Sequence, residues 1–132
     1  NDGLDFSESK VNVSEVYFDT IGAKSISAGE NSVIKIESVN ILNSYLGIVS
    51  KDGSTVIGQD IKNSNVTIPY ASYLKKKEYT KPVLKIVNGQ QENFERLYLK
   101  DYLASITIDN KKKKKITNEI LELIYNPDRR IQ

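Results

Sequence analysis

Five consecutive lysines at positions 111 to 115 form the densest group of charged side chains in the sequence. Their ammonium groups could bind a phosphate, sulfate or carboxylate polymer, with an affinity that falls as salt is added. The alternative is a solvated connection, because water stabilises exposed like charges at little cost. The run is therefore a candidate contact for nucleic acid, anionic lipid or a cell-wall polymer, through Lys111, Lys112, Lys113, Lys114 and Lys115.

A second basic stretch, residues 75 to 77, is bracketed by tyrosines. Tyrosine combines a large apolar ring with a polar hydroxyl and is enriched in protein interfaces. It is also a common strand residue, so these rings could instead belong to the core. The stretch is our first choice for a partner contact, through Tyr73, Lys75, Lys76, Lys77 and Tyr79.

The charges are divided unequally along the chain. Residues 1–72 contain five lysines against nine acidic residues, whereas residues 73–132 contain fourteen lysines and arginines against eight acidic residues. The formal net charge of +2 therefore hides a polar molecule. Unless it reflects only chance and solubility, this layout predicts head-to-tail self-association or docking of the basic half on an acidic surface.

Several residue types that carry chemistry are missing, since the sequence has no His, Cys, Met or Trp. Without His and Cys the chain lacks an imidazole base, a thiolate nucleophile and most ligands of transition metals. Asp2, Asp5 and Glu8 could hold Ca²⁺, but their spacing is not that of a calcium-binding loop, and acidic termini are often simply solvated. We therefore predict that the protein is not an enzyme and has no cofactor and no metal site.

The apolar residues are mainly Ile, Val, Leu and Tyr, which favour strands. Alternation of apolar and polar residues predicts a strand over residues 10–18, with a bulge at Ser14–Glu15. A second long strand is predicted over residues 33–41, with a bend at Ser38. No apolar run approaches the ~18 residues that a membrane-spanning helix needs, so any membrane contact would be peripheral.

The clearest local signal lies at residues 51–54. Asp52-Gly53 supplies the positive φ that a tight hairpin turn demands, and both flanks are apolar and β-branched. The sequence therefore predicts a β-hairpin here. A later strand stops at Pro69, which cannot donate to a ladder and indicates a sheet edge or an exit from the sheet.

The C-terminal part is predicted to contain the one helix, over residues 116–126, because apolar side chains recur on one helical face and Pro127 follows. Residues 94–108 fit either a helix or an extended hairpin, and we favour the extended form. The whole chain, residues 1–132, is predicted to be a single domain. Its expected fold is an antiparallel β-sandwich or partly open barrel of about seven strands with a C-terminal helix.

The chain opens with Asn-Asp-Gly rather than Met, which fits either a processed mature protein or a trimmed fragment. If it is mature, the composition suits a secreted or envelope-associated bacterial protein. The leading functional hypothesis is a non-catalytic structural module that works in assembly or adhesion through protein–protein contacts or self-association, with no evident small-molecule substrate. The alternatives are a polyanion-binding protein that uses the lysine run and a structural subunit of a phage virion.

Overall fold

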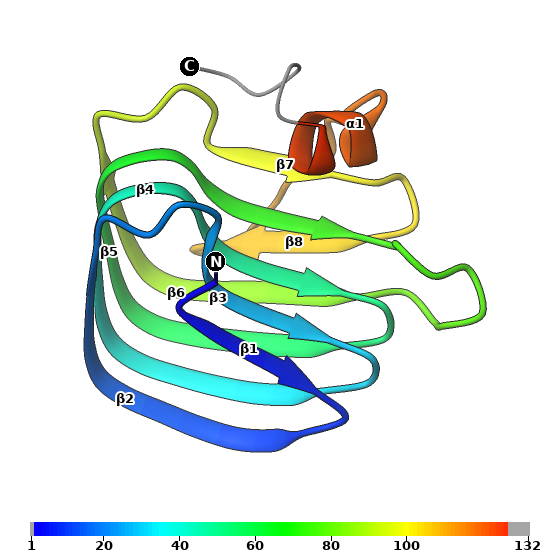
Figure 1. The fold of residues 1–132 in the computed structure, drawn as a ribbon, viewed down its shortest axis with the longest axis horizontal. Coiled ribbons are helices and arrows are strands. Elements are labelled where there is room, and N and C mark those ends of the chain that lie inside the picture. Colours follow the sequence, from blue (N-terminus) through cyan, green and yellow to red (C-terminus); the bar gives the residue numbers. More distant parts are fainter. Residues whose placement is uncertain (1, 127–132) are drawn as a thin grey trace.

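The computed structural model describes residues 2–126. The chain winds into a parallel β-solenoid of about five turns, with 62% of the described residues in strands and 5% in helix. Figure 1 shows the coils stacked on one another, with the N-terminal coil at the bottom. The chain is mainly β, as its composition predicts, but the expected antiparallel sandwich or barrel is wrong: the strand pairs of the described residues run parallel except β8 with β9.

Nine strands and one short helix make up the described chain. They are β1 (Leu4–Ser7), β2 (Lys10–Asp19), β3 (Lys24–Gly29), β4 (Val33–Lys51), β5 (Thr55–Tyr73), β6 (Val83–Glu92), β7 (Tyr98–Lys100), β8 (Ser105–Ile108), β9 (Lys111–Lys112) and α1 (Ile120–Tyr125).

Most positions recur one coil later after 22 residues, as in the pairing of Ile26 with Ile48 and of Ile48 with Tyr70. In the next coil the spacing is 28 residues, since Tyr70 pairs with Tyr98. The extra residues form the loop 74–82, which leaves the stack between β5 and β6. Because equivalent side chains lie above one another, the alternation within each strand builds one continuous core.

Each coil contributes to three faces of the solenoid. The first face contains residues 10–14, 33–37, 55–59, 83–87 and 105–108; the second contains 16–19, 39–42, 61–64 and 89–92; and the third contains 4–7, 24–29, 44–51, 66–73 and 98–100. On the first face the inward column of Ile34, Val56, Leu84 and Ile106 is 0% exposed. Burial of such columns is the main favourable contribution to stability.

Single residues in the left-handed conformation turn the chain from one face to the next. They are Glu15, Ser38, Asp60 and Asn88 between the first and second faces, and Thr20, Asn43, Asn65 and Asn93 between the second and third. Asn and Asp tolerate this conformation better than most side chains do. The bulge predicted at Ser14–Glu15 and the bend predicted at Ser38 are two of these corners.

A ladder of side-chain amides follows the corner between the second and third faces. The Nδ2 of Asn93 donates to Asn65 Oδ1 at 2.9 Å, Asn65 donates to Asn43 at 2.6 Å, and Asn43 donates to Asp19 Oδ1 at 2.9 Å. The ladder ends on a carboxylate in the N-terminal coil.

Two local predictions are wrong because the strands pair in parallel. Asp52 and Gly53 do have positive φ, but their turn leads into the next coil, so residues 51–54 are not a hairpin. Pro69 is buried inside β5 rather than at a sheet edge. Gly47 lies opposite, where a Cβ would collide with the carbonyl oxygen of Pro69. Glycine at this position lets the two coils approach each other.

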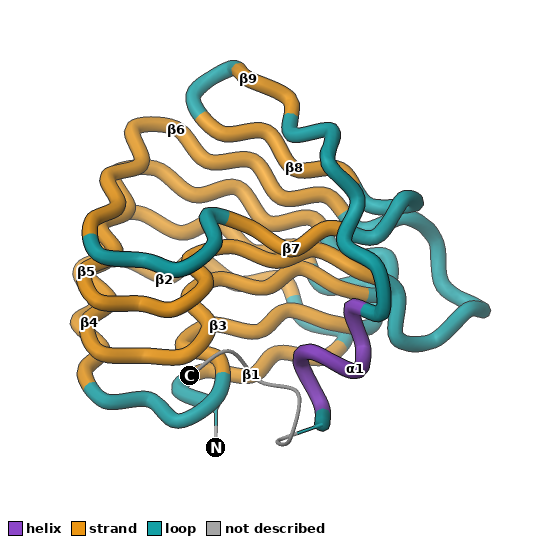
Figure 2. The backbone as a smooth tube through the Cα atoms, turned by 90° about the horizontal axis from the view of Figure 1, so that it is seen from above, coloured by secondary structure: helices purple, strands orange, loops and turns teal. Residues whose placement is uncertain are grey.

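The region 94–108 is extended, with β7 and β8 in place of the alternative helix, but these strands pair with β5 and β6 and not with each other. After β9 the chain turns back across the stack and ends in α1, as Figure 2 shows. The helix begins at Ile120 rather than at residue 116, after Glu119 in the left-handed conformation. Ile120 and Ile124 pack on the outer side of the third face.

Among residues 2–126, no helix has the length and apolar character needed to cross a bilayer.

Candidate interaction site

The N-terminal end of the solenoid is open. Among the described residues, β2 pairs with β4 alone and β1 with β3 alone, so one edge of each strand has no partner strand. Val13 and Phe18 of this coil are buried, but other core-facing side chains stay half-buried, as at Leu4 and Phe6, whereas the neighbours of these two one coil further on, Ile26 and Ala28, are 0% exposed. Val11 and Val16 are half-buried in the same way.

The C-terminal end is covered by the chain itself on two of the three faces, whereas among the described residues no strand pairs with residues 89–92 on the C-terminal side of the second face. On the first face, β9 pairs with β8. On the third face, Thr117 lies against β7: its amide donates to the Lys100 carbonyl at 2.8 Å, and its hydroxyl accepts from the Lys100 amide at 3.0 Å. At the corner between the first and second faces, Asp109 Oδ2 accepts the Gly89 amide at 3.4 Å. The two ends therefore differ, and Figure 2 shows β1 and β9 at opposite ends of the stack.

Acidic residues gather in the open N-terminal coil: Asp2, Asp5, Glu8, Glu15 and Asp19. Asp2 lies 3.9 Å from Lys24 Nζ, a contact at the limit of an ion pair. Hydrogen bonds from Asn43 and Thr20 lower the pKa of the Asp19 carboxyl below its usual value, so this group stays ionised at neutral pH. The lysine run lies in and after β9, at the other end. The acidic N-terminal half and the basic C-terminal half of the sequence therefore place opposite charges at the two ends of the solenoid.

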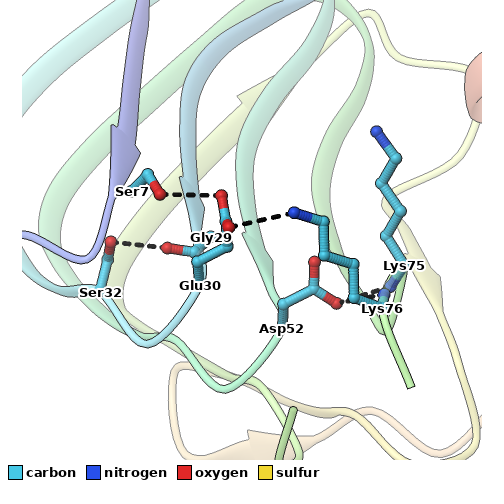
Figure 3. A network of polar contacts seen from close by, with 7 residues as sticks. All are labelled: Ser7, Gly29, Glu30, Ser32, Asp52, Lys75 and Lys76. Atoms are coloured by element: carbon cyan, nitrogen blue, oxygen red, sulfur yellow. Dashed lines mark hydrogen bonds and ion pairs between the residues drawn. The ribbon is translucent and has the colours of Figure 1, made fainter. Parts of the chain in front are cut away.

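The basic loop 74–82 is fixed at its base by a network of polar contacts (Figure 3). The carboxylate of Asp52, a residue only 1% exposed, accepts the amides of Lys75 and Lys76 at 2.7 and 2.8 Å. The Lys76 ammonium donates to Glu30 at 3.0 Å, and the Ser7 hydroxyl donates to the same carboxylate at 2.8 Å. These two bonds lower the pKa of Glu30, with Ser7 as the larger cause.

The tyrosines and lysines chosen for a partner contact have different surroundings. Tyr73 is fully buried, and its hydroxyl lies 2.6 Å from that of Tyr125 on α1. The Lys75 ammonium lies 4.5 Å from the centroid of the Tyr125 ring. Lys76 is paired with Glu30, and Tyr79 is half-buried. Of this set, Lys77 is the exposed cation for which the described residues show neither an ion pair nor a contact with an aromatic ring.

The lysine run divides between two environments. Lys111 and Lys112 form β9, an edge strand, where lysines are a common means of preventing unwanted strand pairing. Lys113 donates its amide to the Ile106 carbonyl at 2.8 Å, and Lys115 donates its amide to the Tyr98 hydroxyl at 3.1 Å. The run is thus tied to the stack by its backbone, while four of its five residues are exposed and Lys113 is half-buried.

In the part of the chain that the structure describes, no three acidic side chains lie close enough together to hold a metal ion. Asp2, Asp5 and Glu8 are spread along the first coil and its corner.

Comparison with known proteins gives no relative: no family model matches the chain, and neither the curated proteins nor the solved structures contain a match.

The open edge was missed by sequence reasoning, which treated residues 10–18 as an ordinary strand. The signal that could have found it is a positional one. Val11, Val13 and Val16 align with Ile34, Ile36 and Val39 at a constant spacing, which marks the first segment as a coil of the same kind.

Proposed function

We propose that this protein is a non-catalytic structural module that closes one end of a β-solenoid assembly, in a secreted or envelope-associated assembly or adhesion protein. Its N-terminal coil receives a further coil from a partner, and its C-terminal segment terminates the stack. The observation that carries this proposal is the difference between the two ends: β1 and β2 are unpaired on one edge, whereas β8 is covered by β9.

Two contributions to the binding free energy favour a further coil as the partner. The free amides and carbonyls of β1 and β2 can form a ladder with an added strand, which gives affinity without a preformed pocket. Leu4, Phe6, Val11 and Val16 would lose their remaining contact with water, at a gain of about 25 cal/mol for each Å² of apolar surface buried. Repeat proteins generally need a covered surface at each end of the stack, and the described residues supply none for β1 and β2.

The chemistry of the first coil also defines the partner. The added segment would alternate apolar and polar residues, so that its apolar side chains meet the half-buried ones of the open end. It would place Lys or Arg near Glu8, Glu15 and Asp19, since these carboxylates lie at or beside the corners of the first coil. In the isolated protein no free coil is present, but the lysine run of a second copy can meet these carboxylates through its charge, with its own stack still covered by β9.

The experiment is light scattering of the purified protein over a dilution series at low and high salt. We expect the mean mass to rise with concentration and the association to weaken with salt, because opposite charges meet. The double variant Val11→Lys/Val16→Lys places charges on the inward side of the open coil and should stay monomeric. Tyr17→Lys adds a charge on the outward side of the same strand and is the matched control, expected to associate like the wild type.

A wild-type protein that remains monomeric across the whole series would contradict the proposal. So would equal association of the wild type and the Val11→Lys/Val16→Lys variant, once urea unfolding has shown that the variant is folded. Loss of association in the Tyr17→Lys control would move the contact from the open edge to the outer surface of β2.

A further inference from the structure

The outer side of the first face carries an uncompensated positive charge. Its outward positions include four lysines, Lys10, Lys35, Lys85 and Lys112, against one acidic residue, Glu37. Among residues 2–126, none of the four lysines forms an ion pair. The outward positions of the second face carry one lysine, Lys62, and two acidic residues. Of these two faces, the first therefore carries the excess of positive charge.

Three of these lysines lie in one column. Lys35 pairs with Ile57, Ile57 with Lys85, and Lys85 with Thr107. Thr107 pairs in turn with Lys112 of β9. Directly paired residues project from the same side of a sheet, so the column alternates lysine with an uncharged residue. Successive lysines are two strand spacings apart, about 9.6 Å, and the order of the column is fixed by the ladder rather than by side-chain flexibility.

The surface around the column is shaped as well as charged. Two depressions meet at Lys35, at the N-terminal end of the column. One of 190 Å³ reaches Lys10 and Val33, and one of 420 Å³ reaches Ile57 and Gln59 and is also lined by Glu37. Val33 and Ile57 are each 40% exposed, so aliphatic side chains lie beside the cations. A chain lying along the column would meet cations at regular intervals, with amide and hydroxyl groups and methyl groups between them.

We propose that the first face binds a linear anionic polysaccharide, whose sulfate or carboxylate groups pair with Lys35, Lys85 and Lys112. Single-stranded nucleic acid is the less suitable polymer, because it is held by bases stacked on aromatic rings and the outward positions of this face carry none. Double-stranded DNA is read by an element that enters a groove, which a flat sheet face does not offer. This surface lies to the side of the stack and does not depend on the open end, so either proposal can fail without the other.

The test measures binding of heparin, as a sulfated polysaccharide, and of polygalacturonate, as a carboxylated one, across a salt series. The column variant is Lys35→Gln/Lys85→Gln/Lys112→Gln. Its matched control is Lys62→Gln/Lys77→Gln/Lys81→Gln, which removes the same charge from exposed positions away from the first face. All six side chains are exposed, so both variants should fold like the wild type.

We expect the wild type to bind at least one of the two polysaccharides, and the column variant to lose at least about tenfold in affinity. Its slope of log affinity against log salt should fall by roughly two, since each lost contact with a polyanion removes about 0.7 to 0.9. The control should remain within about twofold of the wild type. Equal losses in the two variants, no binding by the wild type, or tighter binding of single-stranded DNA than of either polysaccharide would each overturn the proposal.

Discussion

The hydroxyl of Tyr125, in the last turn of α1, lies 2.6 Å from the hydroxyl of Tyr73, which is buried in the third face. The two rings meet edge to face with their centroids 6.1 Å apart. Lys24 and Lys75 approach the Tyr125 ring, at 4.8 and 4.5 Å from its centroid. This contact attaches α1 to the stack. It also holds in place the segment that leads to α1, in which Thr117 covers the end of the third face.

Removing one of the two hydroxyls should weaken that contact. In Tyr125→Phe the buried Tyr73 hydroxyl loses its protein partner, so we expect a loss of about 1–2 kcal/mol in the free energy of unfolding. A double-mutant cycle with Tyr73→Phe, followed by urea unfolding, should give a coupling of about 0.5–1.5 kcal/mol. Additive effects of the two substitutions would show that the hydroxyls do not interact.

The Asp52 carboxylate should control the order of the loop 74–82. Asp52→Ala removes the acceptor of two partly buried hydrogen bonds from backbone amides and should cost about 2–4 kcal/mol in the free energy of unfolding. Loosening of the loop should also speed trypsin cleavage after Lys75, Lys76 and Lys77. Asp60→Ala, at an exposed corner, is the comparison variant. Equal cleavage rates in the two variants would mean that Asp52 does not anchor the loop.

The amide ladder and the corner conformation can be separated at Asn65, whose φ is 56°. Asn65→Gly keeps a residue that accepts positive φ but removes both ladder bonds, whereas Asn65→Ala also adds strain of about 1 kcal/mol. We expect stability to fall in the order wild type, Gly variant, Ala variant, by about 1 kcal/mol at each step, in urea unfolding. An Ala variant as stable as the Gly variant would contradict the corner assignment.

Alkaline pH should destabilise the fold through its buried phenols. Burial raises the pKa of Tyr70 and of Tyr73 well above the ordinary value of 10.0. Because the unfolded chain ionises first, their contribution is complete below that value and is lost as pH rises from it towards the raised folded pKa. Each phenol should add about 1.4 kcal/mol per pH unit to the slope. Tyr70→Phe should flatten the decline in stability measured from pH 9 to 12 (roughly the range in which an unfolded phenol ionises). Unchanged slopes would contradict this assignment.

The sequence predicts strands well but not the way in which they pair. Alternation at Val11–Val13 and at Ile34–Ile36 is the same in an antiparallel hairpin and in a solenoid coil, because both bury one side of a strand. The turn at Asp52-Gly53 has the expected positive φ. Its local geometry is compatible both with a strand that pairs antiparallel to the previous one and with a strand that begins the next coil. The hairpin was therefore wrong although its turn residues and both strands were right.

The repeat of the solenoid coils could not be recognised in the sequence, because equivalent positions are not occupied by identical residues. Equivalent positions share only apolar character or tolerance of the left-handed conformation, as at Ser38, Asp60 and Asn88. The extra residues of the loop 74–82 then change the spacing from 22 to 28 residues in mid-chain. The number of charged residues in each half could be counted from the sequence. The column formed by Lys35, Lys85 and Lys112 could not be predicted, because it depends on the strand register, which only the structure shows.

Amide hydrogen exchange at low and high protein concentration separates the open N-terminal coil from the C-terminal end, which β9 and Thr117 cover on the first and third faces. An open N-terminal end predicts that the amides on the unpaired edges of β1 and β2 exchange fast in dilute protein and become protected as concentration rises, while the amides of β8 keep the same protection throughout. Protection of β1 and β2 that is independent of concentration, or a concentration-dependent change confined to β8 and β9, would contradict it.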